Sequence, residues 1–178
     1  MCLQAIWRQV QALGLQRLYC TDDTIKLQIR QLMALPFARL PLIQPTFQAL
    51  LANSDQRLAP LFAYFQNAWL QPGLTRIWNM YGVDIRTDNN LEGWHSRFNR
   101  GIGKFHPNIW EFLEYVLLEH NSTDVQIQQL RAGAVPNPPD AKYVRIRKNL
   151  ARLRDRYNMG RLNTEQYITA VSHNLKHY

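Results

Sequence analysis

The sequence has little of what disulfide-framed, low-complexity or membrane-spanning proteins require. Of its 178 residues, two are cysteines, eight glycines and nine prolines, which excludes a multi-bridge disulfide framework and a collagen-like or disordered chain. Cys2 and Cys20 also lack the spacing of a metal site. No apolar run approaches the roughly 18–20 residues that span a bilayer. We therefore expect a soluble, intracellular, globular protein with no membrane contact.

Acidic side chains are also scarce. The chain has 13 Asp and Glu against 21 Lys and Arg, which gives a formal net charge of +8. A signal peptide is not expected at the N-terminus, because its apolar core would be interrupted by Gln4, Arg8 and Gln9. Because the chain is basic, a polyanion is a reasonable partner. If that partner is DNA, we expect the protein to be in the nucleus.

Apolar residues recur at intervals of three and four along most of the chain, as in amphipathic helices. The pattern predicts an all-α, mostly helical fold, with only Val83 to Arg86 alternating like a strand. The five tryptophans lie at apolar helical positions and are predicted to pack in the core. Helices are expected over these ranges: 3–13, 21–35, from 41 or 45 to 52, 60–69, 89–102, 107–131, 141–158 and 164–176.

Residues 132–140 contain Pro136, Pro138 and Pro139 and are predicted to be a linker, because no helix tolerates this spacing. The chain is thereby divided into a helical region (1–131), a Pro-rich linker (132–140) and a basic helical tail (141–178). Asn163 followed by Gln166 has the spacing of a capping box for the last helix.

The densest group of polar and aromatic residues lies between Arg86 and Phe112. It contains Arg86-Thr87-Asp88-Asn89, then Glu92-Gly93-Trp94-His95, and later His106-Pro107 with Ile109-Trp110. This pattern resembles the end of the catalytic domain in Mutator-like (MULE) transposases of the animal type, with Asp88 where that family has Asn. Agreement in the flanks, such as Trp78-Asn79 with Tyr81, is less specific.

The resemblance implies a remnant of a ribonuclease-H-like domain, made of its helical insertion and its terminal Glu-bearing helix. In that family two Asp and a final Glu hold Mg²⁺ or Mn²⁺, and the final Glu corresponds to Glu92. Both Asp residues would precede Gln4, so the chain is expected to be truncated before them. Two-metal chemistry needs several converging carboxylates. We therefore expect no enzymatic activity and no cofactor unless the missing Asp residues are supplied.

Glu92 also has a structural interpretation, since Asn89 at the N-cap with Glu92 three residues later would form a capping box. A metal site built on Glu92 and His95 is disfavoured, because carboxylate sites of that type need two such pairs. Asp22 and Asp23 are predicted to cap a helix and occupy its first turn rather than to replace missing ligands.

The tail holds nine Lys and Arg against two acids. Four of these cations are separated by three, four and four residues, so they share one face of the expected helix. The apolar residues on the other face are Val144, Leu150, Leu153 and Tyr157. This cationic ridge could follow phosphates without reading bases, or it could be a solvated face paired with acids between residues 84 and 124. The ridge consists of Arg145, Lys148, Arg152 and Arg156.

Together these patterns predict a transposon-derived protein that is catalytically inactive and binds DNA nonspecifically or associates with a full-length transposase. A helical protein-interaction module with no nucleic-acid role is the alternative. Neither interpretation involves a small-molecule substrate.

Overall fold

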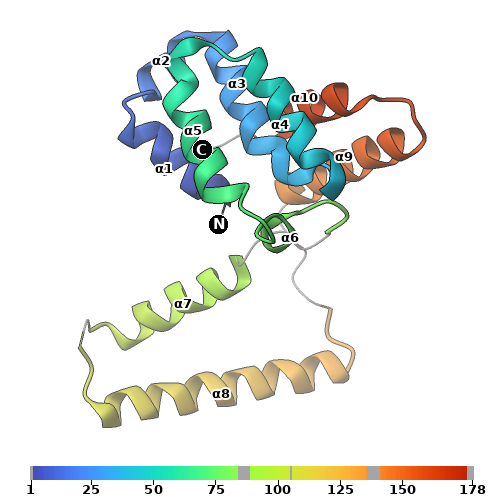
Figure 1. Cartoon of the computed structure of the whole chain (residues 1–178). Helices are drawn as coiled ribbons and strands as arrows, with labels where there is room; N and C mark the ends of the chain where they lie inside the picture. The colour runs from blue at the N-terminus through green and yellow to red at the C-terminus, as the bar shows by residue number, and fades with distance from the viewer. Residues whose placement is uncertain (1, 84–88, 105, 136–140, 176–178) are drawn as a thin grey trace. The chain divides into compact units, whose positions relative to one another are not determined.

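Every regular element in the described part of the chain is helical, and no strand occurs there (Figure 1). The computed structural model describes residues 2–83, 89–104, 106–135 and 141–175, without the side chains of residues 2, 89–92 and 143. The predicted all-α class is confirmed. The strand expected at Val83 to Arg86 falls mostly outside the described residues.

The α-helices are α1 (Cys2–Ala12), α2 (Gln16–Thr21), α3 (Asp23–Ala34), α4 (Ile43–Ala52), α5 (Ala59–Trp69), α6 (Thr75–Trp78), α7 (Asn89–Ile102), α8 (Ile109–Arg131), α9 (Ala141–Asn158) and α10 (Thr164–Asn174). Short 3₁₀ turns separate some of them: η1 (Leu35–Phe37), η2 (Leu40–Leu42) and η3 (Gln56–Leu58).

Local sequence signals fix several helix ends. The Asp22 carboxylate accepts hydrogen bonds from the backbone N–H groups of Thr24 and Ile25 and so caps α3, as its position predicts. The predicted capping box of α10 is present at Asn163 and Gln166. A second capping box, which sequence reasoning missed, begins α8 at Asn108 and Glu111.

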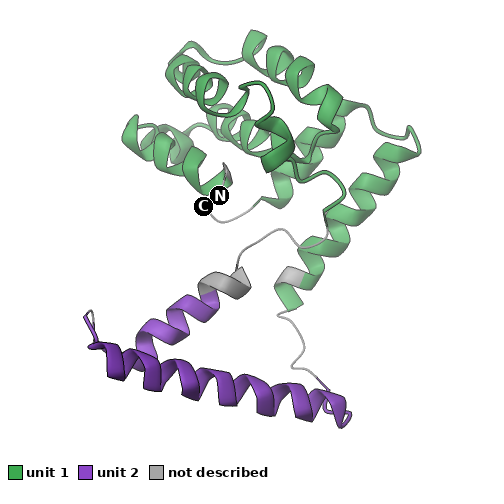
Figure 2. Ribbon diagram, turned by 60° about the horizontal axis from the view of Figure 1, so that its bottom comes forward, with its two compact units in different colours: residues 1–84, 141–178 green, residues 85–140 purple. Residues whose placement is uncertain are grey.

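The chain forms two compact units (Figure 2). Unit 1 contains residues 1–84 and 141–178, and unit 2 contains residues 85–140. These bounds differ from the ranges expected from the sequence, because the tail helices α9 and α10 belong with the N-terminal helices: α10 packs against both α3 and α9. The Pro-rich segment 132–140 marks the end of unit 2, but no local pattern indicates that the tail packs with the N-terminal helices.

Unit 1 is organised around an aromatic and aliphatic core. Phe47 stacks on Phe65 with 5.6 Å between ring centroids, and it also contacts Phe62 at 5.8 Å. Trp78 meets Phe65 edge to face and donates its indole N–H to the Trp69 carbonyl at 2.8 Å. Burying each such side chain contributes roughly 1.5–3 kcal/mol, which makes this cluster a main source of stability in unit 1.

Unit 2 is a hairpin of α7 and α8. Phe98 of α7 meets Phe112 and Tyr115 of α8 edge to face, and the Arg97 guanidinium binds the Glu119 carboxylate at 2.9 and 3.2 Å. Gly101 permits close approach at this seam, since a Cβ there would lie 1.5 Å from the Tyr115 hydroxyl oxygen. Phe98 is nevertheless the only buried hydrophobic residue among the described residues of unit 2.

The predicted core role is wrong for two of the tryptophans. Trp110 is 76% exposed and Trp94 is 37% exposed, while α8 contains no buried residue. An amphipathic pattern identifies an apolar face, but a two-helix hairpin has too few neighbours to cover it. None of the helices in the described ranges is long and apolar enough to span a membrane.

Candidate nucleic-acid interface

The predicted cationic ridge lies on a helix whose opposite face is anchored in unit 1. Leu150 and Tyr157 of α9 are buried, and Ile146 and Leu153 pack against the same core. Val144, also predicted to face inward, is half-buried. The core therefore fixes which side of α9 faces outward.

All four ridge residues are exposed. Because an α-helix rises 1.5 Å per residue, their backbone positions extend over roughly 16 Å of the α9 axis. Across residues 2–83, 89–104, 106–135 and 141–175 the structure contains no ion pair that involves Arg145, Lys148, Arg152 or Arg156. The ridge thus presents cations to solvent along one helical face.

Two of the acids expected to compete for the ridge are engaged elsewhere. Glu119 pairs with Arg97, and the Arg97 hydrogen bond holds the pKa of this carboxyl below its usual value. Glu111 pairs with Lys104, whose hydrogen bond likewise lowers the Glu111 pKa. These pairs lie within unit 2 and close its own hairpin.

Polar residues beside the ridge are committed to structural contacts. The Asn149 amide donates to the Asn174 side-chain oxygen at 3.3 Å, which links α9 to α10. The Tyr157 ring stacks on Tyr167 of α10 with 4.5 Å between centroids and 5° between planes. The ridge is therefore flanked by groups that hold the two helices together and not by free amides that could read a base edge.

A clamp at the C-terminal end of α9 was missed by sequence reasoning. The Arg39 guanidinium donates to Tyr81 Oη at 3.2 Å and to Asn158 Oδ1 at 2.8 Å, and it lies 4.6 Å from the Tyr157 ring centroid. The Tyr81 hydrogen bond raises the Arg39 pKa. These residues are 42 to 119 positions apart in sequence, so no local pattern could have revealed the clamp.

The segment that carries the transposase-like pattern also has structural roles. Asn79 donates its side-chain amide to the carbonyls of Pro36 and Ala38 at 3.1 and 2.8 Å, and the Met80 N–H donates to Pro36 as well. The resemblance in the flank therefore includes a residue, Asn79, that holds the η1 segment.

Glu92, the residue matched to the final catalytic acid, belongs to α7, but its side chain lies outside the described residues, as does all of Asp88. His95, three residues after Glu92, is exposed beside Trp94, with 5.0 Å between ring centroids. Among the described side chains no group of three His, Cys, Asp or Glu is arranged to hold a metal ion.

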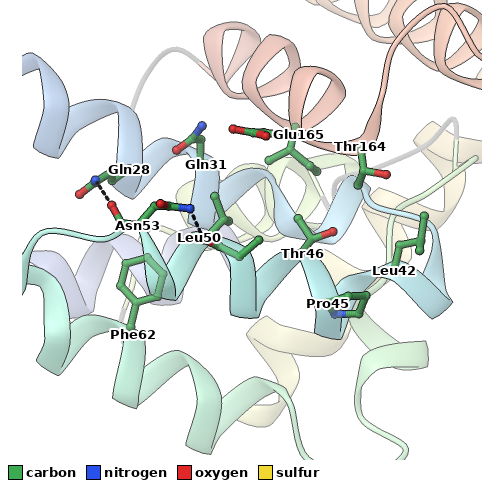
Figure 3. A pocket seen from close by; sticks show the side chains of 12 residues that line it. Gln28, Gln31, Leu42, Pro45, Thr46, Leu50, Asn53, Phe62, Thr164 and Glu165 are labelled. Carbon is green, nitrogen blue, oxygen red and sulfur yellow. Dashed lines mark hydrogen bonds between the residues drawn. The ribbon is translucent and has the colours of Figure 1, made fainter.

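Unit 1 also contains a cavity of about 420 Å³ between α3, α4, α5 and α10 (Figure 3). The three amide side chains of its lining are already hydrogen-bonded: Gln28 donates to the Asn53 carbonyl, Asn53 donates to the Ala49 carbonyl, and Gln31 donates to the Thr169 hydroxyl, each at 2.9 Å. The apolar part of the lining consists of Leu42, Pro45, Ala49, Leu50, Phe62 and Ile168. The amide groups of the cavity are therefore committed to contacts within unit 1.

Comparison of the chain with known protein families, with curated proteins and with solved structures finds no match. The transposase resemblance therefore rests on the residues between Arg86 and Phe112 and enters below as a proposal.

Proposed function

We propose that this protein binds nucleic acid nonspecifically through the cationic ridge of α9, and that the chain derives from the C-terminal part of a Mutator-like transposase. The observation that carries the binding proposal is the ridge itself: four exposed cations on one face of a helix whose other face is buried. Phosphates along either strand of a duplex offer a matching row of negative charge.

The chemistry of the ridge favours phosphate over base recognition. Arginine forms paired hydrogen bonds to phosphate oxygens, and lysine adds a mobile point charge. Arginine can also contact guanine, but readout of a mixed base sequence needs amide, carboxylate or hydroxyl groups as well, and the neighbouring Asn149 amide is bonded to Asn174. Binding should consequently depend on charge and salt concentration and little on sequence.

A salt titration tests this function. For Arg152→Ala with Arg156→Ala, we expect weaker binding to duplex DNA and a smaller slope of log affinity against log salt, by roughly 0.9 for each lost phosphate contact. The charge-matched control is Arg17→Ala with Arg76→Ala, because both arginines are exposed residues of unit 1 that do not belong to α9. An equal loss in both variants, or no binding by the unaltered chain at about 50 mM salt, would refute the proposal.

We propose binding without catalysis for the chain on its own, because two-metal phosphoryl transfer requires several carboxylates around the ions and the resemblance supplies one, Glu92. The test is incubation of the purified chain with transposon-end DNA and Mg²⁺ or Mn²⁺. Metal-dependent nicking that Glu92→Gln abolishes would overturn this part of the proposal.

Association with a full-length transposase is a second candidate function, and the exposed apolar surface of unit 2 favours it. Large apolar side chains remain exposed along α8, and surfaces of this kind mark sites of protein association. Crosslinking between the purified chain and a full-length Mutator-like transposase tests this. Crosslinks that map to α8 are expected, and their absence would leave unit 2 without this role.

A further inference from the structure

The cavity of unit 1 lies among helices that contact one another without filling the space between them. α3 packs against both α4 and α10, and the space that these helices and α5 border measures about 420 Å³ (Figure 3). Small-molecule sites in proteins have volumes of roughly 300–1,000 Å³. The cavity is therefore large enough for a small organic ligand.

One part of the lining is apolar. Pro45 and Ala49, four residues apart, lie on one face of α4, and Leu50 follows directly. Phe62 of α5 and Ile168 of α10 also line the cavity, and both side chains are almost fully buried. An apolar group that lies against these residues leaves water, which favours its binding.

The lining carries a single charged residue, Glu165, in the first turn of α10. The chain has a formal net charge of +8, yet no Lys, Arg or His lines this cavity. In the described part of the chain no ion pair involves Glu165, and the capping box of α10 uses Asn163 and Gln166 instead. The cavity thus presents one carboxylate that is not engaged by a cation of the described residues.

The amide groups of the lining are held by the protein. Gln31 donates to the Thr169 hydroxyl, while Gln28 donates to the Asn53 carbonyl and accepts from the Asp55 backbone N–H. A ligand therefore meets mainly apolar surface and the Glu165 carboxylate. An anion would face this carboxylate without a counter-cation, whereas a positively charged donor would form a charge-assisted hydrogen bond with it.

We propose that this cavity binds a small organic cation in which an ammonium group is joined to an apolar body. The ammonium group pairs with the Glu165 carboxylate, and the apolar body lies against Leu50, Phe62 and Ile168. The ligand is bound and not converted, so the site requires no small-molecule substrate. It goes beyond nucleic-acid binding, because none of the four ridge residues lines the cavity.

Three ligands with the same apolar body test the role of charge: phenylbutylamine, phenylbutanol and phenylbutyrate. At neutral pH the first is a cation, the second is uncharged and the third is an anion. In NMR titrations of the full chain, the amine should bind roughly three- to fivefold more tightly than the alcohol, as expected for a partly exposed ion pair. Equal binding of amine and alcohol, or tightest binding of the carboxylate, would overturn the proposal.

Glu165→Gln tests the assigned partner of the ammonium group. It should lower the affinity for phenylbutylamine to that for phenylbutanol and leave the affinity for phenylbutanol unchanged. Asp23→Asn is the matched control, because Asp23 is an exposed acid in the first turn of α3 and lies outside the lining. If Glu165 served only the dipole of α10, Glu165→Gln would leave the ratio of the two affinities unaltered, and that result would refute the proposal.

Ala49→Trp tests the location, because the larger side chain would occupy the cavity. It should abolish binding of both phenylbutylamine and phenylbutanol, whereas Gln48→Trp, on an exposed position of α4 outside the lining, should retain both. Amine binding that survives Ala49→Trp would place the ligand elsewhere and refute the site. DNA binding by the ridge should be unchanged in Ala49→Trp, so the two binding functions can fail separately.

Discussion

Unit 1 and unit 2 are built from similar amphipathic helices, but they bury their apolar faces to different extents. In unit 1, residues from the first half of the chain and from the tail converge on one core, which includes Phe47, Tyr157 and Tyr167. In unit 2 two helices meet along a single seam, and Phe98 is the only hydrophobic residue buried there among those described. Burial thus depends on how many elements surround a face, and not on the face alone.

The largest contrast should appear when an aromatic side chain is removed from each unit. Phe47→Ala is expected to reduce the free energy of unfolding by about 3–5 kcal/mol, because Phe47 is fully buried against Phe62 and Phe65. Trp110→Ala should change it by no more than about 0.5 kcal/mol, because that side chain is mostly exposed. Urea unfolding at low protein concentration measures both. Equal destabilisation would show that α8 is covered in the monomer.

The hairpin seam can be broken without touching unit 1. Gly101→Ala places a Cβ against the Tyr115 hydroxyl, and relieving this overlap should cost about 1–3 kcal/mol. Hydrogen exchange should accelerate in α7 and α8 and stay unchanged in α3 and α10.

Gly93→Ala is the matched control on the same helix, since a Cβ there meets no atom within 4 Å. It should stabilise α7 by about 0.5–1 kcal/mol, because alanine favours the helix over glycine. Similar exchange in both variants would argue against the close Gly101–Tyr115 contact.

The two capping boxes offer a smaller and more closely matched comparison. Asn163→Ala and Asn108→Ala each remove a side-chain oxygen that accepts backbone N–H groups at a helix start, at a cost of about 1 kcal/mol. Asn163→Ala should lower the global unfolding midpoint, because α10 packs on the core of unit 1. Asn108→Ala should act mainly on exchange at the start of α8. A global effect of the same size from both would show that the units unfold together.

The smallest expected effect is on the stability of unit 1 at acidic pH, where Asp22 and Asp55 become protonated. Hydrogen bonds from the Arg57 side chain and backbone lower the pKa of Asp55 from 3.8 to about 2, and a backbone hydrogen bond from Ile25 lowers that of Asp22. Because the folded-state pKa is the lower one, this stabilisation is complete above the unfolded value near 4 and is lost as pH falls towards 2.

Arg57→Gln should therefore flatten the decline of stability between pH 4 and pH 2, as measured by urea unfolding. In unit 2, Arg97→Gln removes the guanidinium that lowers the Glu119 pKa. Its effect should be confined to the hairpin and should leave the unfolding of unit 1 unchanged. A steeper decline in Arg57→Gln would contradict the assigned direction of the Asp55 shift.

The local features of the fold could be predicted from sequence because their signals are local. The apolar period placed α9 at residues 141–158, and Asn163 with Gln166 predicted the cap of α10. The same reasoning placed the four ridge cations on one face, because helical geometry alone fixes that relation. It missed the short α2 and the Arg39 clamp; the clamp depends on contacts between distant segments.

The sequence by itself determined the helical class, several helix boundaries and the spacing of charge along α9, because these follow from backbone geometry over a few residues. Only the tertiary structure decided which apolar side chains are covered: the tail joins the N-terminal helices in one core, while α8 keeps many of its large apolar side chains exposed. The physical reason is that burial depends on neighbours far away in the chain, and one amphipathic pattern suits both a core and an interface.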